Sequence, residues 1–297
     1  MAIKAVKAVI NGQTYNLTLN SGTGKYEATV TAPAESSYNQ PGHYYNVQVT
    51  AEDDAGNTTT KDASDGTLGA SLQLQVKEKV APIITIIAPT EGATITNNKP
   101  TIAWAVTDED SGVDPDTISI KIDSGSVITS GISKTASGKG FTCSYTPTTA
   151  LSDGSHTITV NASDYDGNAA TAKTTTFKVD TVPPTLSVIS PEEGLVTNQA
   201  TITVSGTTND ATSSPVTLTI NSDPVEVGAD GAFSTTITLN SGENTITIIA
   251  TDSAGKSTTV TRHVTLDTGA PVFQSGTITP NPVDAGKTFV ISVEVTD

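Results

Sequence analysis

Hydrophobic and polar residues alternate along most of this chain in short runs, which is the period of β-strands with one buried face. The clearest runs lie between residues 100 and 160, separated by turns rich in Gly, Asn and Asp, and helical signals are missing. The pattern predicts an all-β fold with a core built from these strand faces. The inward positions are Ile102, Trp104 and Val106, then Ile118, Ile120 and Ile122, then Ile158 and Val160.

The pattern also repeats along the chain. Three similar segments, each an alternating strand followed by an Asp/Gly turn, lie at Val49–Asn57, Val160–Asn168 and Ile248–Lys256. Prolines open three extended runs and favour short, stiff linkers, because the residue before a proline is biased toward extended backbone. A chain of 297 residues holds about three domains of roughly 90 to 100 residues. The expected segments are 1–80, 81–181, 182–268 and 269–297.

These repeats resemble the bacterial immunoglobulin-like repeats of surface adhesins and of tail and other virion proteins of bacteriophages and prophages. The resemblance is carried by Asp230–Phe233, Gly242–Asp252 and Asp110–Pro115, and it covers nearly the whole chain. It implies tandem immunoglobulin-like β-sandwiches. It implies little about function, because this sandwich supports many roles.

The first segment aligns with only part of the third. Ile10-Asn11-Gly12 matches Ile220-Asn221-Ser222, so residue 1 falls near the start of the third strand of a sandwich. Segment 1–80 is therefore expected to lack the first two strands, A and B. Segment 269–297 is expected to supply such a pair, because its ending Val295-Thr296-Asp297 matches Val106-Thr107-Asp108.

The two fragments are complementary. A sandwich without strands A and B leaves a strand edge unpaired, and an isolated hairpin is marginally stable in water. Insertion of the hairpin into a second copy satisfies both, and we expect Phe289, Ile291, Val293 and Val295 to make that contact. The product is a head-to-tail homo-oligomer, either a ring or a filament. The alternatives are a segment cut from a longer array and a divergent, truncated first sandwich.

Charge narrows the expected partners. The chain has 31 Asp and Glu against 15 Lys and Arg, a net charge of −16, which disfavours nucleic acid and anionic membranes. No apolar run is long enough to cross a membrane, and the first ten residues lack a secretory signal. We expect a virion or extracellular, cell-surface location, reached after signal removal or by another route such as host lysis. The expected partners are other copies, other virion proteins or a cell-surface glycan.

Acidic residues gather where domains should meet. In this fold the loops after the second and sixth strands lie at the end of the sandwich where the preceding linker enters. The carboxylates of these loops and of the linker are therefore expected to lie close together. Calcium, which takes about six to eight oxygen ligands, is the cation we expect there. The alternative is ordinary hairpin chemistry, since Asp/Gly turns are common and no EF-hand loop is present. The candidate ligands are Asp180, Asp210 and Asp252 in one group, and Glu78, Asp108, Asp110, Asp164 and Asp166 in the other.

Aromatic residues concentrate in residues 38–45, where Tyr38, His43 and Tyr44 are candidate glycan contacts. The alternative is structural: Tyr45 caps a strand corner, and Tyr38 or Tyr44 packs beneath it. His156 occupies the position of Tyr45 in the second repeat, so we expect it to cap a corner rather than to bind a metal.

Catalytic patterns are missing from the sequence. The three histidines lie in different repeats without metal-ligand spacing, and neither a Gly-x-Ser-x-Gly motif nor a Gly-rich phosphate loop is present. The single cysteine, Cys143, alternates with aromatic residues on one strand and is expected to be buried and inert. We expect a protein that is not an enzyme and that requires no cofactor; calcium is the one candidate ion.

Overall fold

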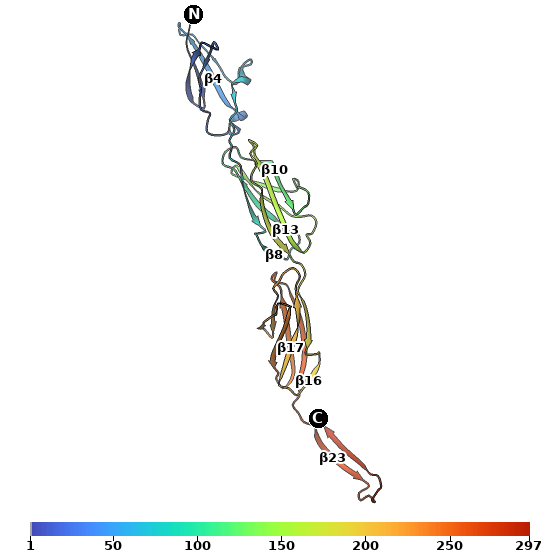
Figure 1. The fold of residues 1–297 in the computed structure, drawn as a ribbon. Coiled ribbons are helices and arrows are strands. Elements are labelled where there is room, and N and C mark those ends of the chain that lie inside the picture. The colour runs from blue at the N-terminus through green and yellow to red at the C-terminus, as the bar shows by residue number, and fades with distance from the viewer. Residues whose placement is uncertain (1) are drawn as a thin grey trace. The chain divides into compact units, whose positions relative to one another are not determined.

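The computed structural model describes residues 2–297 and is all-β (Figure 1). One compact unit ends at Val179 and a second begins at Asp180. The helical elements of the described residues are three short 3-10 turns, η1 (Ser37–Asn39), η2 (Pro41–His43) and η3 (Gly69–Leu72). None of them has the length or apolar character to cross a membrane. The predicted all-β class is confirmed, and the chain consists of tandem immunoglobulin-like folds.

The second segment is a two-sheet sandwich with a dry core. Ile102, Trp104 and Val106 are 0% exposed, as the alternation predicted, whereas Ile122 is only partly buried at the edge of the core. One sheet has the order β11 (Ser133–Ser137), β12 (Gly140–Tyr145), β9 (Ile102–Thr107) and β7 (Ile83–Ala88). The other has the order β10 (Val113–Ile122), β13 (Gly154–Asp164), β14 (Lys173–Val179) and β8 (Ala93–Ile95).

The third segment, in the second unit, repeats this architecture. Its core includes Val204, Ile246, Ile248 and Ala250, all at most 1% exposed. One sheet has the order β15 (Thr185–Ser190), β17 (Thr201–Asn209) and β20 (Ala232–Thr238). The other has the order β16 (Leu195–Thr197), β22 (Ser257–Leu266), β21 (Gly242–Thr251), β18 (Thr217–Ile220) and β19 (Asp223–Val225).

The strands of residues 2–80 all belong to a single sheet. This sheet contains the counterparts of the β22–β21–β18–β19 layer, and residues 28–35, which follow β3, pair with no strand. The turn after β1 uses positive φ at Asn11 (47°), as the matching turn after β18 does at Asn221 (51°). The sheet order is β3 (Lys25–Glu27), β2 (Gln13–Asn20), β1 (Ile3–Ile10), β4 (Tyr45–Asp53) and β5 (Thr58–Lys61), with β6 (Gln73–Leu74) also on β4.

The last two strands, β23 (Val272–Thr279) and β24 (Val290–Thr296), form an antiparallel hairpin that pairs with no other strand of the described chain. Their register repeats that of the first two strands of each complete sandwich. The first residue of one strand faces the last residue of the other in Val272↔Thr296, as in Ile83↔Thr107 and Thr185↔Asn209.

Polar side chains cap the same strand corner in all three segments. The Tyr45 hydroxyl donates to the Glu35 carbonyl at 3.2 Å, and Asn244 Nδ2 donates to the Asn240 carbonyl at 2.8 Å. His156 Nε2 lies 2.7 Å from the Ser152 carbonyl, and its Nδ1 lies 2.8 Å from Asp123 Oδ2. The expectation that His156 caps a corner is confirmed.

The capping geometry predicts a pH-dependent stability of the second sandwich. Burial acts to lower the pKa of His156, but hydrogen bonds to the Ser152 carbonyl and the Asp123 carboxylate outweigh it and raise the pKa. A raised pKa means that the folded state binds the proton more tightly than the unfolded chain does. The stabilisation is therefore complete below the unfolded value of about 6.5 and is lost as pH rises through the folded pKa.

Urea unfolding can be followed by the fluorescence of the sole tryptophan, Trp104. The urea concentration at the midpoint should decrease as the pH is raised from 5.5 to 8. His156→Asn, which copies the residue at Asn244, should remove this dependence. A midpoint that rises over the same range would contradict the assignment.

Candidate cation and docking sites

Three carboxylates meet at one end of the third sandwich. Asp180 lies in the segment before β15, Asp210 directly follows β17, and Asp252 directly follows β21. One oxygen from each lies within 4.8 Å of the others. The sequence predicted this convergence, and the structure brings these three residues together.

This cluster is buried, and no ion pair within residues 2–297 neutralises it. Asp180, Asp210 and Asp252 are 1%, 8% and 5% exposed. Their Oδ1 atoms accept backbone N–H groups from Val182, from Thr212 and Ser213, and from Lys256. Asp180 Oδ2 and Asp252 Oδ2 are buried without any hydrogen-bond partner, as is Ser213 Oγ. Carboxylates packed together away from water are costly unless a cation compensates them.

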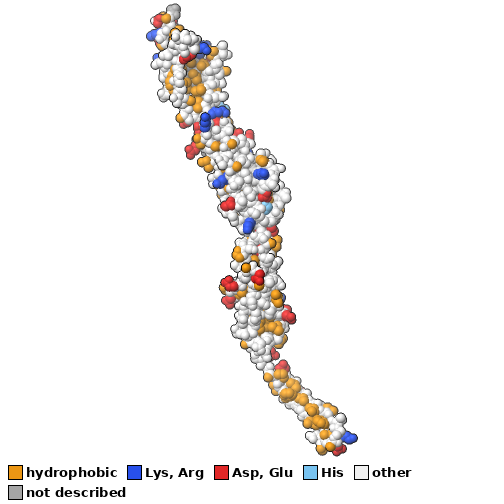
Figure 2. Space-filling model, viewed as in Figure 1, with side chains coloured by type: hydrophobic (Ala, Val, Ile, Leu, Met, Phe, Trp, Pro, Cys, Tyr) orange, Lys and Arg blue, Asp and Glu red, His pale blue; other side chains and the backbone are white. Residues whose placement is uncertain are grey.

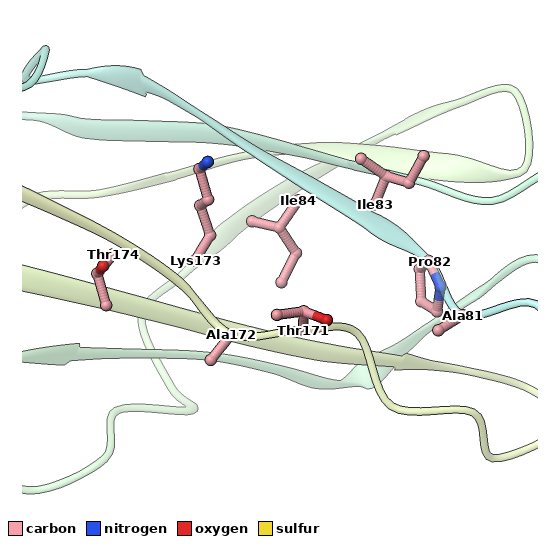
Figure 3. A pocket seen from close by; sticks show the side chains of 8 residues that line it. All are labelled: Ala81, Pro82, Ile83, Ile84, Thr171, Ala172, Lys173 and Thr174. Carbon is pink, nitrogen blue, oxygen red and sulfur yellow. The ribbon is translucent and has the colours of Figure 1, made fainter.

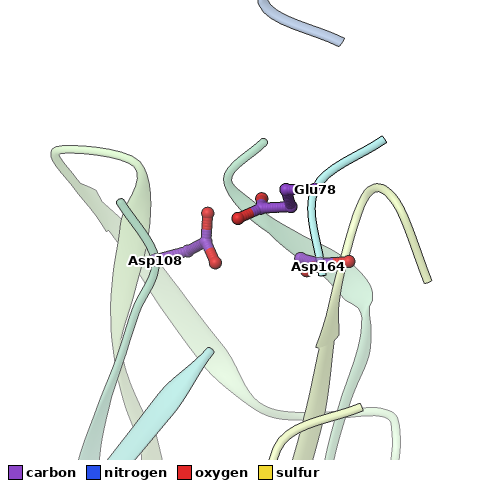
Figure 4. Close-up of side chains that lie close together, drawn as sticks. All are labelled: Glu78, Asp108 and Asp164. Atoms are coloured by element: carbon purple, nitrogen blue, oxygen red, sulfur yellow. The ribbon is translucent and has the colours of Figure 1, made fainter. Parts of the chain in front are cut away.

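A second cluster occupies the equivalent end of the second sandwich. Glu78, Asp108 and Asp164 also bring one oxygen each within 4.8 Å of the others, and Figure 4 shows the carboxylates of Glu78 and Asp108 facing each other. Asp164 is 2% exposed. Among the ion pairs found in residues 2–297, none involves a carboxylate of either cluster. We call the two clusters the acidic triads.

Two of the predicted ligands lie outside these triads. The carboxylate of Asp110 accepts from Ser36 N at 2.9 Å and from Asn39 Nδ2 at 2.8 Å. Asp166 Oδ2 accepts from Glu78 N at 3.0 Å. The Asp110 carboxylate therefore joins the loop at residues 36–39 to the second sandwich, and the Asp166 carboxylate joins the linker residue Glu78 to the same sandwich.

The aromatic loop is packed by ring stacking. The ring of Tyr38 stacks on His43 at 4.0 Å and on Tyr165 of the second sandwich at 4.1 Å between centroids. Tyr45 is buried at the corner, as the structural alternative required, and Tyr44 is half-buried. Sequence patterns did not indicate Tyr165 as a partner, because the stack joins residues far apart in the chain. A glycan contact at Tyr38, His43 and Tyr44 stays a prediction.

The face of the N-terminal sheet that corresponds to the core face of a complete sandwich is only partly covered. Val6, Ala8 and Ile10 of β1 are buried on this face, at most 9% exposed, so the opening lies along β4. Val47, Val49 and Ala51 of β4 are half-buried, whereas their counterparts in β21 are Ile246, Ile248 and Ala250, at most 1% exposed. Figure 2 shows hydrophobic side chains gathered on this part of the molecule. A groove on the face is lined almost wholly by apolar atoms, from Val49, Ala51, Thr59, Lys61, Leu68 and Leu72. We call this surface the acceptor face.

The terminal hairpin exposes a matching apolar row. Phe289, Ile291, Val293 and Val295 are 47%, 65%, 50% and 46% exposed and alternate on one side of the hairpin. By the shared register, Ile291, Val293 and Val295 correspond to Ile102, Trp104 and Val106, which are 0% exposed. Hydrophobic side chains run along the whole hairpin in Figure 2. We call this side of the hairpin the donor face.

A hollow opens between the start of β7 and the start of β14, lined by residues 81–84 and 171–174, of which Lys173 is the charged member (Figure 3). Another is lined by Tyr38 and His43 of the aromatic loop together with Lys77, Tyr165 and Asp166. The thiol of Cys143 is 1% exposed, and burial raises its pKa to about 11. At neutral pH it is therefore a protonated core group, as the sequence predicted.

Each of the two complete sandwiches matches a known family model. Residues 89–181 match the family model of a bacterial Ig-like domain, and residues 184–268 match the model described as glucodextranase, domain B. Bacillopeptidase F of Bacillus subtilis (strain 168) is 34% identical over 123 residues, which are 41% of this chain and 8% of that protein. The chain thus spans a small part of this curated relative.

Two solved structures are similar at low identity. An I-band fragment of titin is 14% identical, with 89% of this chain and 88% of that chain covered and a TM-score of 0.43. The fibronectin(III)-like modules of Clostridium thermocellum CbhA are 17% identical, with 62% and 94% covered and a TM-score of 0.35.

Proposed function

The chain is a tandem immunoglobulin-like protein with a bacterial Ig-like domain at residues 89–181, and we propose that it is a non-catalytic structural protein that self-associates head to tail. Domains of this kind are typical of extracellular and surface proteins and suggest a structural or carbohydrate-binding module. In the proposed assembly, the hairpin β23–β24 of one copy docks on the acceptor face of the next. The product is a component of a virion tail or of an extracellular filament.

The observation that carries the proposal is that the N-terminal segment lacks the first two strands of a sandwich, whereas the C-terminal hairpin has the register of those two strands. In the third sandwich, β20 pairs with β17 along its length, from Thr201↔Thr238 to Thr207↔Ala232. In the N-terminal segment, residues 28–35 follow the equivalent strand start and pair with no strand. The strand with the register of β17 is β24. Docking supplies both the missing backbone hydrogen bonds and the missing core row.

Hydrophobic burial gives this contact its driving force. Complete burial of a Val, Ile or Phe side chain is worth about 1.5 to 3 kcal/mol, and the four donor side chains are now about half exposed. Part of this gain is offset by the entropy lost on association. Burial of the acceptor side chains adds to it, so stable association at micromolar concentration is a reasonable expectation.

The two faces belong to different surfaces of the chain, so the interface is heterologous. Such an interface closes into a ring or continues as an open filament. Because each copy carries one donor and one acceptor, every added copy presents a fresh acceptor or donor to the next. A polymer rather than a closed dimer is the expected product.

Multi-angle light scattering tests the proposal. The full chain should show a mass that grows with concentration, whereas a version that ends at Thr268 should stay monomeric because it lacks the donor. Electron microscopy of the full chain should show fibres or rings. Equal monomer masses for both versions at high concentration would remove the proposal.

A second candidate function is a spacer stalk or ligand-binding module within a larger surface or secreted protein. The matches to glucodextranase domain B and to part of Bacillopeptidase F favour it. In that case the segments would hold a binding or catalytic domain at a distance, and the chain would remain monomeric. Glycan-array binding that is lost in Tyr44→Ala would support the ligand-binding form of this candidate.

A further inference from the structure

Both acidic triads are built from the same three positions. The first is the linker residue five positions before the opening strand, Glu78 before Ile83 or Asp180 before Thr185. The second directly follows the second strand, at Asp108 or Asp210. The third stands where a strand leads into the Asp/Gly turn: Asp164 is the last residue of β13, and Asp252 directly follows β21.

The terminal hairpin carries the first two of these positions. Asp267 lies five residues before Val272, the first residue of β23, and Asp297 directly follows Thr296, the last residue of β24. The linker geometry is also repeated. Gly269 N donates to Asp267 Oδ1 at 2.9 Å, as Val182 N donates to Asp180 Oδ1 at 3.1 Å. The hairpin therefore presents two thirds of a triad and lacks the third carboxylate.

The third position lies in the N-terminal sheet, at Asp53. Asp53 Oδ1 accepts from Asn57 N at 2.9 Å, as Asp164 Oδ1 accepts from Asn168 N at 2.7 Å and Asp252 Oδ1 from Lys256 N at 2.9 Å. Asp53 Oδ2 also accepts from Asn57 Nδ2 at 2.9 Å, as Asp164 Oδ2 accepts from Asn168 Nδ2 at 2.7 Å.

Resting on the proposed self-association, we propose that each acidic triad binds a calcium ion and that a third site forms between two copies. Asp53 of the accepting copy and Asp267 and Asp297 of the donating copy provide its carboxylates. In an isolated chain Asp267 and Asp297 are exposed, so this site exists only where two copies are joined. Calcium would then bind at the contact between two copies, which we call the joint, as well as in the two complete sandwiches.

The chemistry of the triad in the third sandwich supports a divalent cation. Asp180 Oδ2 and Asp252 Oδ2 are buried oxygens without a partner, within a cluster that no lysine or arginine neutralises in the described chain. Buried polar side-chain atoms normally have a hydrogen-bond partner, so a cation would supply what these two oxygens lack. Calcium takes several carboxylate, carbonyl and water oxygens in a flexible geometry, and it suits loops that also present backbone carbonyls.

Linkage makes the proposal measurable. A cation that binds the joined copies more tightly than the separate ones must strengthen the joint by the same factor. We expect calcium to tighten association about tenfold or more, within the range usual for coupled sites. Without calcium, three carboxylates would be brought together uncompensated, and association would rest on the donor face alone.

The test is the association constant of the full chain, measured by sedimentation velocity in chelator and in calcium chloride. Asp53→Asn keeps the Oδ1 acceptor of the turn but removes a charge, and it should abolish the calcium effect while association in chelator persists. Asp54→Asn, an exposed neighbour in the same turn, is the matched control and should keep the full effect.

Calcium stoichiometry gives a second readout. The associated full chain should bind one more ion per copy than the version that ends at Thr268, in native mass spectrometry or equilibrium dialysis. Association of equal strength with and without calcium, or equal stoichiometry in the two versions, would overturn the shared site and leave self-association standing. A full chain that stays monomeric under both conditions would overturn both proposals.

Discussion

Ile291→Asp is expected to weaken head-to-tail association at least a hundredfold. Ile291 is 65% exposed in the single chain, and its counterpart in the second sandwich, Ile102, is 0% exposed. Docking would therefore carry the new carboxylate into an apolar core with no positive partner nearby. A buried, unpaired charge costs about 3 to 5 kcal/mol, which is more than a hundredfold in the association constant. Light scattering over a concentration series measures the effect.

The neighbouring residue offers a matched control. Val290 is 63% exposed, but it points to the opposite side of the hairpin, where its counterpart in the second sandwich, Thr101, is exposed. Val290→Asp adds the same charge to the same strand and should leave association within a few-fold of the unmodified chain. Equal losses in the two variants would show that the donor face does not enter a core.

Ile120→Ala is expected to destabilise the second sandwich by about 2 to 5 kcal/mol. The side chain of Ile120 is 0% exposed and lies in one core cluster with Trp104 and Cys143. Shortening it removes buried methyl groups and leaves a cavity that a rigid sandwich fills only in part. Trp104 is the only tryptophan of the chain, so its fluorescence during urea unfolding reports this sandwich selectively.

Val127→Ala provides the comparison for this variant. Val127 belongs to the same sandwich but is 59% exposed, so its truncation should change the free energy of unfolding by no more than about 0.5 kcal/mol. A small effect at Ile120 and a small effect at Val127 together would contradict the dry core seen at β9, β10 and β13.

Local patterns were sufficient for the fold class and for much of the core. Ile102, Trp104 and Val106 alternate with less buried residues, and that period places them on one face of β9 whatever surrounds the strand. The corner position of His156 also followed from its alignment with Tyr45 and Asn244. The prediction of full burial was wrong at Ile122. This residue keeps the alternating period of its strand but lies at the edge of the core, where burial is incomplete.

Local sequence patterns could not predict contacts between segments that are far apart in the chain. The stack of Tyr38 on Tyr165 and the hydrogen bond from Ser36 N to Asp110 depend on how the N-terminal sheet meets the second sandwich. Five acidic residues were candidates for the triad of the second sandwich, and only the fold selected Glu78, Asp108 and Asp164 from them. A periodic pattern reports which side of a strand a residue occupies, but not the distance between two loops.

The amino-acid sequence by itself determined the strands, their buried faces and the repeated positions of the acidic residues, because these depend on short-range alternation and turn chemistry. Tertiary structure decided which carboxylates converge and which of their oxygens, such as Asp180 Oδ2 and Asp252 Oδ2, are left without a donor. It also decided which apolar faces stay open, since burial depends on the layer that packs against a sheet. A second sheet packs over β10, β13 and β14, whereas the strands of residues 2–80 form one sheet, whose inner face is buried along β1 but only half-buried along β4.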